Sequence, residues 1–266
     1  MSYIELKDID FEYPNHFTAV EHVSLQINKG EKIAIVGQNG AGKTTTVKLM
    51  NGLMKPTRGT VLVDGWDTKE HTTAEISRKV GYVFQNPDDQ IFHNDVYSEI
   101  EFGPKMLGFS PERVKEAVES AAALSDVSQF LKENPYNLPF STRKFVTIAS
   151  VIAMDSDVLI FDEPTAGQDM QGMEILSNLI NQLTAKGKTI ITITHDMEFV
   201  VKNFDRIIVM AHKNVLMDGT KEEIFWNQEL LKEAKLKQPY ISDLANALGL
   251  KQGIISIDEF LEAYQK

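Results

Sequence analysis

The most informative segment of the sequence is KIAIVGQNGAGKTT, residues 32–45. Its second part fits the pattern G-x-x-x-x-G-K-[ST], in which glycines let successive backbone N–H groups turn toward phosphate oxygens. The apolar run before it predicts a buried strand, and the residues after it predict a helix whose N-terminus attracts anions. A glycine-rich turn without a ligand is the alternative interpretation. Together, the strand and the pattern favour a nucleotide-binding α/β fold.

Two polar residues of this loop, Lys43 and Thr44, have specific predicted roles. We expect Lys43 to bridge the β- and γ-phosphates of ATP and Thr44 to ligate Mg²⁺ through its hydroxyl. Tyr13, in FEYP, either stacks on the adenine ring or packs in the core as a strand aromatic. The residues predicted to bind nucleotide are Tyr13, Gly37, Asn39, Gly40, Ala41, Gly42, Lys43, Thr44 and Thr45.

A second motif, VLIFDEP at residues 158–164, delivers two carboxylates at the end of an apolar strand. Ligands bind at the carboxyl ends of strands in α/β sheets. We expect Asp162 to hold Mg²⁺ through water and Glu163 to act as general base on the attacking water. Alone, such a pair is usually a solvated turn, but the phosphate loop reverses that preference.

Two further polar residues follow apolar strands. His195 ends TIITITHD and could donate to the γ-phosphate and position the attacking water, or it is a surface or capping imidazole. Gln85 follows VGYVF, and its amide could contact both Mg²⁺ and water. The predicted catalytic residues are therefore Glu163, His195 and Gln85, and the predicted metal ligands are Thr44, Gln85 and Asp162.

Composition excludes several other classes of function. The net charge of -11 argues against nucleic acid as a partner, because the phosphate backbone attracts basic surfaces. The absence of cysteine rules out disulfides and zinc-thiolate sites. The start lacks the pattern of a signal peptide, and no apolar run approaches the roughly 20 residues of a spanning helix. We expect any membrane role to depend on a partner.

The order of predicted elements is that of an α/β protein. Strand-like runs occupy residues 3–13, 23–28, 32–37 and 59–65, and helical patterns dominate after residue 85. Strands return at residues 157–161 and 189–194 with a helical run between them, as expected for a parallel sheet covered by helices. We predict one domain at 1–226, with a helical subdomain at about 86–155, and a helical extension at 227–266.

These motifs occur in the order FEYP, GQNGAGKTT, VFQNPDDQIF, VLIFDEPTAG and TITHD, which resembles an ABC-transporter ATPase up to about residue 225. FEYP and VFQNPDDQ are similar to the energy-coupling factor (ECF) ATPases, of the EcfA or CbiO type. The resemblance implies a RecA-like P-loop core with an antiparallel β subdomain and a helical subdomain. It also implies a head-to-tail dimer with two ATPs at its interface, on the cytoplasmic face of the membrane. The implied membrane partners are an EcfT-like transmembrane coupling protein and a substrate-binding S component.

One motif departs from this family. The family has a signature of the type LSGGQ before a helix, and the ungapped alignment places Leu138, Pro139, Phe140, Ser141 and Thr142 there. A signature serine and its glycines donate to the γ-phosphate of the partner's ATP, whereas proline has neither hydroxyl nor N–H and phenylalanine adds bulk. The D-loop, AGQDM, also departs, with Gln168 and Met170 for the usual Leu and Pro, but Asp169 is retained.

We therefore expect a heterodimer with a second, related ATPase subunit. That subunit supplies an intact signature to this chain's site and receives a weakened one in return. In the alternative, Ser141 and Thr142 take over the signature contacts in a homodimer, as in the ATPase of a dedicated metal-ion importer. A soluble, non-transport ABC ATPase is a third interpretation, although the second ATPase half or coiled-coil insertion usual in that class is missing.

Two segments have predicted contacts with partners. In NPDDQIFHNDVYSEIEFGP, residues 86–104, apolar Ile91, Phe92, Val96 and Phe102 among acidic residues suit a groove for a membrane subunit's helix, or else belong to the helical core. The run YISDLANALGL, residues 240–250, has apolar spacing for a dimer contact or for covering its own sheet. The transported substrate lies outside what the sequence specifies.

Overall fold

A computed structural model describes residues 2–250 and 253–265 of the 266-residue chain. Its central sheet has six strands in the order β10-β9-β3-β8-β7-β6, and all neighbours are parallel except β10 with β9. The predicted P-loop α/β class is confirmed. The strands are β3 (Lys32–Val36), β6 (Val80–Val83), β7 (Val158–Asp162), β8 (Thr189–Ile193), β9 (Arg206–Ala211) and β10 (Asn214–Thr220).

Both faces of this sheet are buried, which explains why its strands read as continuous apolar runs. On β3, Ile33 and Ile35 join one hydrophobic cluster, and Ala34 and Val36 join the other. Successive side chains of a strand point to opposite faces, so one short strand contributes to two cores. The phosphate loop that follows β3 is thus anchored from both sides.

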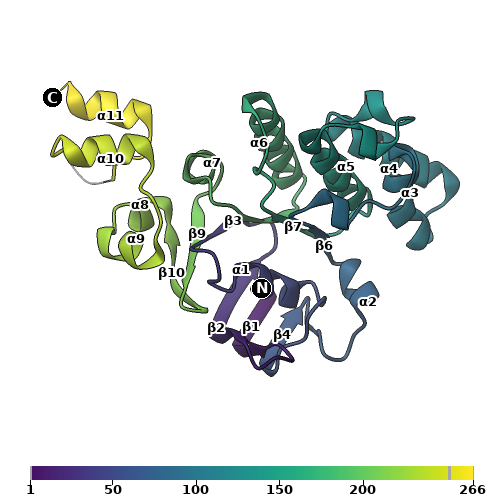
Figure 1. Cartoon of the computed structure of the whole chain (residues 1–266), viewed down its shortest axis with the longest axis horizontal. Coiled ribbons are helices and arrows are strands. Elements are labelled where there is room, and N and C mark those ends of the chain that lie inside the picture. The colour runs from purple at the N-terminus through teal and green to yellow at the C-terminus, as the bar shows by residue number, and fades with distance from the viewer. Residues whose placement is uncertain (1, 251–252, 266) are drawn as a thin grey trace.

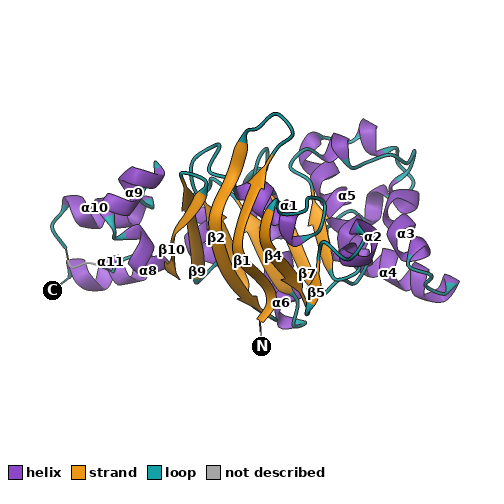
Figure 2. Cartoon of the chain, turned by 90° about the horizontal axis from the view of Figure 1, so that it is seen from below, coloured by secondary structure: helices purple, strands orange, loops and turns teal. Residues whose placement is uncertain are grey.

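A second, antiparallel sheet packs over one of these cores. Its order is β2-β1-β4-β5, and Figure 2 shows β2, β1 and β4 side by side. Helix α1, which begins at the phosphate loop, belongs to the same hydrophobic cluster as this sheet, so the sheet covers the helix. The elements are β1 (Ser2–Glu12), β2 (Thr18–Asn28), β4 (Arg58–Val63), β5 (Trp66–Asp67) and α1 (Lys43–Met50).

Helices cover the other face and both ends of the molecule (Figure 1). Between β6 and β7 lie α3 (Val96–Met106), α4 (Pro111–Leu124) and α5 (Phe140–Ala153). The Ser110 side chain caps α4 by accepting from the backbone N–H of Arg113. The short α2 (Thr73–Ser77) precedes β6. The later helices are α6 (Met170–Ala185), α7 (Met197–Asn203), α8 (Lys221–Phe225), α9 (Gln228–Ala234), α10 (Tyr240–Ala247) and α11 (Ile257–Tyr264).

The C-terminal helices form a small unit at the opposite end from α3 and α4 (Figure 1). Leu230 and Leu231 of α9 belong to the main core, whereas α10 and α11 carry exposed apolar side chains. The predicted boundary at 226/227 falls between α8 and α9 and stays a prediction. Among residues 2–250 and 253–265, no helix combines the length and apolar character needed to cross a bilayer.

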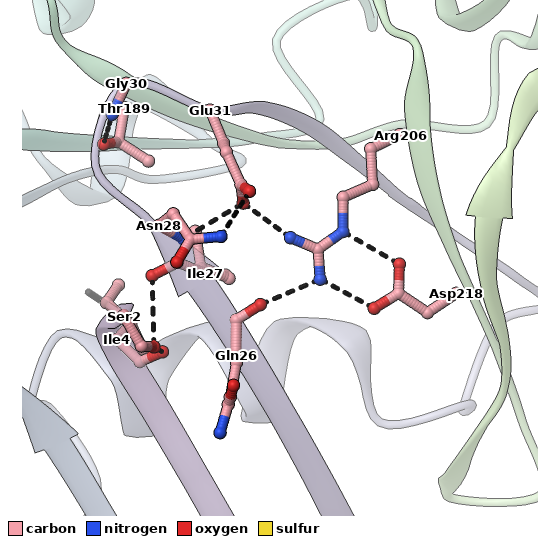
Figure 3. A network of polar contacts seen from close by, with 10 residues as sticks. All are labelled: Ser2, Ile4, Gln26, Ile27, Asn28, Gly30, Glu31, Thr189, Arg206 and Asp218. Carbon is pink, nitrogen blue, oxygen red and sulfur yellow. Dashed lines mark hydrogen bonds and ion pairs between the residues drawn. The ribbon is translucent and has the colours of Figure 1, made fainter.

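A polar network ties the two sheets together at one edge (Figure 3). The guanidinium of Arg206 on β9 donates to Glu31, to both carboxylate oxygens of Asp218 on β10, and to the backbone carbonyl of Gln26 on β2. The paired carboxylates raise the pKa of Arg206, so it stays charged. Because an ammonium cannot make these directed contacts together, arginine is specifically suited to this junction.

Candidate functional site

The phosphate loop passes so close to neighbouring backbone that two of its positions admit only glycine. A Cβ built on Gly37 would lie 1.9 Å from the carbonyl O of Met210, and one on Gly42 would lie 2.6 Å from that of Ala19. Both have positive φ, 147° and 95°. Gly40 also has positive φ but faces open space, as expected where a ligand approaches.

The predicted phosphate lysine is already oriented into this loop. Lys43 is 6% exposed, and its Nζ donates to the carbonyl O of Gly37 at 2.7 Å and of Gln38 at 3.0 Å. Burial lowers the pKa of Lys43, and the carboxylates of Glu163 and Asp162 oppose that shift. A desolvated ammonium held by backbone carbonyls is suited to exchange them for anionic oxygens.

Two of the three ligands predicted for Mg²⁺, Thr44 and Asp162, lie together. Thr44 Oγ1 donates to Asp162 Oδ1 at 3.4 Å, and Tyr82 OH donates to Asp162 Oδ2 at 2.6 Å. Asp162 is 2% exposed. Hydroxyl and carboxylate oxygens are the donor types that Mg²⁺ prefers, so these residues fit that ion. The Tyr82 hydroxyl fixes the orientation of the carboxylate.

The two predicted catalytic side chains also meet. His195 Nε2 lies 3.1 Å from Glu163 Oε1, and both residues line the same cavity as the phosphate loop. Burial raises the pKa of Glu163 to about 7; the Lys43 ammonium opposes the shift and the Asp162 carboxylate adds to it. Burial, followed by the Lys43 charge, lowers the pKa of His195, so its ring is neutral at pH 7.

Gln85 and Tyr13 occupy the rim of the site. Gln85 is exposed and lines the cavity with Asn39, and no hydrogen bond joins its amide to Asp162 or Thr44. Tyr13 is half-buried, its OH lies 3.2 Å from Thr45 Oγ1, and its ring packs edge-on against Phe11 at 4.9 Å. Both alternatives for Tyr13, core packing and adenine contact, stay open.

The changed signature lies at the start of α5. Pro139 is the N-cap residue and makes no side-chain cap, and Phe140 is the first helical residue. Leu138 is buried, whereas Ser141 and Thr142 are half-buried in the first turn. Gln168 of the D-loop donates to the carbonyl O of Ser141 at 3.2 Å.

Asp169 of the D-loop caps α6. Its Oδ1 accepts from the backbone N–H of Gly172 at 2.8 Å. This contact orients the D-loop at the start of α6, where a carboxylate is favoured by the helix dipole. The retained aspartate therefore has a role within its own chain.

Sequence reasoning missed two polar residues that touch the predicted site. Tyr82 lies in the apolar strand VGYVF and had no predicted role, yet its hydroxyl contacts Asp162. Lys144 followed the changed signature and had no predicted role, yet its Nζ donates to the carbonyl O of Glu163. The available signal was a lysine at the start of the mostly apolar run KFVTIASVIAM.

Comparison with known proteins places this geometry in a family. A family profile described as ABC transporter matches residues 20–166. The chain belongs to the ABC transporter ATPase family. Of curated relatives, this ABC ATPase is 42% identical to the energy-coupling factor transporter ATP-binding protein EcfA2 of Methanospirillum hungatei, over 92% of its own length. It is 37% identical to EcfA of Methanocaldococcus jannaschii, over 96% of its length and 92% of the relative.

The fold agrees with solved ABC ATPases. CbiO1 from Clostridium perfringens, described as part of the ABC transporter complex cbiONQ, superimposes with a TM-score of 0.78 at 30% identity, covering 92% of this chain and 99% of that one. The predicted ABC fold class and the ECF-type resemblance are confirmed. Some relatives are longer: the chain spans 62% of EcfA2 and about half, 46%, of a relative from Caldanaerobacter subterraneus.

The raised pKa of Glu163 predicts how hydrolysis by this ABC ATPase depends on pH. Glu163, the predicted general base, can accept a proton only as the carboxylate, so kcat/KM should rise with pH through about 7 and level off above it. At pH 6 about a tenth of the free enzyme would carry the carboxylate. Rates measured from pH 6 to 8, with MgATP affinity measured in parallel, test this. A flat kcat/KM would contradict the assignment of Glu163 as the base.

Proposed function

We propose that this chain binds and hydrolyses MgATP as the peripheral ATPase of an ECF-type importer of vitamins or other micronutrients. The observation that carries the proposal is Glu163 and His195 in contact at the edge of the phosphate-loop cavity. In this position Glu163 accepts a proton from water, and neutral His195 orients the same water or a phosphate oxygen. Lys43 holds the terminal phosphates, and Thr44 and Asp162 hold Mg²⁺. When bound, that ion neutralises phosphate charge.

ATP-driven closure of two such subunits is the proposed motor. Nucleotide between two ATPase subunits adds contacts that only the closed state makes, so binding shifts the equilibrium toward closure. Hydrolysis removes the terminal phosphate that these contacts need, and the pair reopens. In the assembly we propose, an EcfT-like coupling protein transmits this motion to the S component, and the ATPases stay on the cytoplasmic face.

The start of α5 supports the heterodimer rather than the homodimer. Proline as N-cap offers no hydroxyl, and Phe140 replaces the flexible backbone of glycine. The carbonyl of Ser141 is engaged by Gln168. The first-turn helix amides remain as donors, but the lid offered to the partner's nucleotide is weaker than a complete signature. A related subunit with an intact signature then serves the site that contains Glu163.

Restoring the signature should increase hydrolysis at the partner's site. With Glu163→Gln silencing this chain's site, adding Pro139→Ser and Phe140→Gly restores a hydroxyl and close backbone approach. We expect about a tenfold or greater rise in the remaining turnover, because a phosphate-binding donor typically contributes that much or more. Pro135→Ser, outside the signature, is the control. An unchanged rate would favour the homodimer, in which Ser141 and Thr142 suffice.

A groove between α3 and the central sheet supports a membrane partner. It is lined on one side by Phe92 and Phe102, which are 60% and 40% exposed, and on the other by Leu53. For Ile91 and Val96, which are 3% and 0% exposed, the groove interpretation is wrong and the alternative, a place in the helical core, is confirmed. Glu99 is also buried. Its carboxylate accepts from the backbone N–H groups of Phe92 and His93, which compensates for the loss of water.

An acidic residue in this groove should separate the ATPase from its membrane partner. Phe102→Asp places a charge where an apolar helix face would pack, and we expect recovery of the membrane protein with the tagged chain to fall about tenfold. MgATP affinity should stay unchanged. Ile257→Asp, a change at a 67% exposed side chain on α11, is the matched control. Equal recovery with Phe102→Asp and the wild type would exclude this groove as the docking site.

Co-purification tests the whole proposal. The tagged chain is expressed in its native host, membranes are solubilised gently, and the recovered proteins are identified by mass spectrometry. We expect a second ATPase with an intact signature and a multi-span membrane protein. Recovery of the chain with only itself and that membrane protein would replace the heterodimer by a homodimeric importer. Recovery with soluble proteins only would favour the non-transport ABC ATPase.

A further inference from the structure

Lys144 is a buried cation that the catalytic scheme above does not use. It lies on the second turn of α5 and is 2% exposed. Its ammonium donates to the backbone carbonyl of Glu163, and the ring of Phe140 lies 5.5 Å away. A buried charge is retained only where it is paired or hydrogen-bonded, and an aromatic face adds a favourable contact. The ammonium is therefore directed at the backbone of the catalytic residue.

The backbone of Glu163 needs such support. Its φ is +51°, a left-handed conformation that is unfavourable for a residue with a Cβ. Its N–H donates to the carbonyl O of Ile193 at 2.9 Å, and its carbonyl accepts from Lys144. The residue is thus held from β8 on one side and from α5 on the other. These two bonds hold the backbone from which the carboxylate reaches His195, 3.1 Å away.

Phe140 and Gln168, which depart from the family sequence, make a second set of contacts next to Glu163. The ring of Phe140 lies over Gly167, where an added Cβ would be 3.1 Å from the ring Cδ1. Gln168 reaches back to the carbonyl O of Ser141 at 3.2 Å. Gly172 leaves room for the Gln168 amide, since a Cβ there would lie 2.3 Å from its Oε1. The signature and D-loop departures therefore contact each other's segments within one chain.

We propose that the first two turns of α5 clamp the catalytic segment of their own chain. Lys144 is the positioning residue for Glu163, and Phe140 and Gln168 close the clamp around Gly167. This inference rests on the proposed function, in which Glu163 hydrolyses ATP. The changed signature then serves the site in its own chain, in addition to weakening the lid over the partner's nucleotide. The Phe140 ring lies over the buried ammonium, with its centroid 5.5 Å from Lys144 Nζ.

The test replaces the ammonium while keeping the shape of the side chain. Lys144→Met removes the charge and the donor, and Lys144→Arg keeps both. Lys55→Met is the control, because the Lys55 ammonium likewise donates to backbone carbonyls, of Thr68 and His71, outside the nucleotide cavity. Single-turnover hydrolysis of radiolabelled MgATP and its Kd are measured in the purified assembly, with the partner ATPase's catalytic glutamate changed to glutamine.

A misplaced general base lowers the rate of chemistry while leaving binding intact, and an error of 1 Å can cost about a hundredfold. We expect Lys144→Met to slow hydrolysis about tenfold or more with a Kd within about twofold of the wild type. Lys144→Arg should recover most of that loss, and Lys55→Met should show none. In assemblies where Glu163→Gln silences this chain's site instead, Lys144→Met should leave the partner's turnover unchanged.

Three results would overturn the clamp: a wild-type rate for Lys144→Met, no recovery with Lys144→Arg, or a Kd that rises in parallel with the loss of rate. If Lys144→Met does not fold, Gln168→Leu is measured instead, because it removes only the bond to Ser141. A wild-type rate for that variant would also contradict the clamp. A wild-type assembly that fails to hydrolyse MgATP would overturn the proposed function and the clamp with it.

Discussion

Glu163→Gln should nearly abolish ATP hydrolysis by this chain's site while leaving MgATP binding intact. The carboxylate is 3.1 Å from the His195 ring and lines the phosphate-loop cavity, and in the proposed mechanism it is the base for the attacking water. Loss of a positioned general base costs about a hundredfold to ten-thousandfold in rate. Glutamine keeps the size of the side chain and cannot accept the proton. ATP should therefore accumulate in a closed, stable pair, detected as nucleotide that co-elutes with a dimer.

The same substitution tests which of the two sites in the proposed heterodimer hydrolyses ATP. In the proposed heterodimer the changed signature covers the partner's nucleotide, so Glu163→Gln should remove most turnover of the complex and the equivalent change in the partner should remove little. Glu174→Gln, which alters an exposed carboxylate on α6, controls for the loss of charge. Most activity remaining in Glu163→Gln, with loss in the partner's variant, would reverse the assignment.

Sequence reasoning succeeded where short-range pattern determines structure. The phosphate loop follows a strand and begins a helix, so its geometry depends on neighbouring residues in the chain. Ligands bind at the carboxyl ends of parallel strands, and that rule predicted that Glu163 and His195 would both lie beside the phosphate site. In the structure they do. The assignment of catalytic roles to these residues stays a prediction.

The contacts that escaped prediction join segments far apart in the chain. Tyr82 reaches Asp162, and Lys144 reaches Glu163, through the packing of separate elements. Nothing in their own strand or helix pattern specifies that partner. The groove interpretation of Ile91 is wrong for a related reason. The composition of residues 86–104 does not specify which of their apolar side chains face the core. Long-range packing therefore decides the details of this site.

Gly37→Ala should be the most damaging substitution in the phosphate loop. The added Cβ would lie 1.9 Å from the carbonyl O of Met210 on β9, a backbone atom that cannot move without disturbing the central sheet. The φ of Gly37, 147°, adds strain for any residue with a side chain. We expect a loss of about 3 kcal/mol or more in the free energy of unfolding. Urea titration of the purified chain measures it.

Gly30→Ala separates the two causes of this loss. Gly30 also has a positive φ, 81°, but a Cβ there meets nothing within 4 Å. Gly30→Ala should lower the free energy of unfolding only by the cost of the backbone strain, about 1–2 kcal/mol. Gly37→Ala should also weaken MgATP binding, because the Gly37 carbonyl accepts from Lys43 at 2.7 Å and its displacement moves the ammonium. Equal losses of stability in the two variants would mean that β9 yields to the clash, and the loop would then be less tightly anchored than its contacts imply.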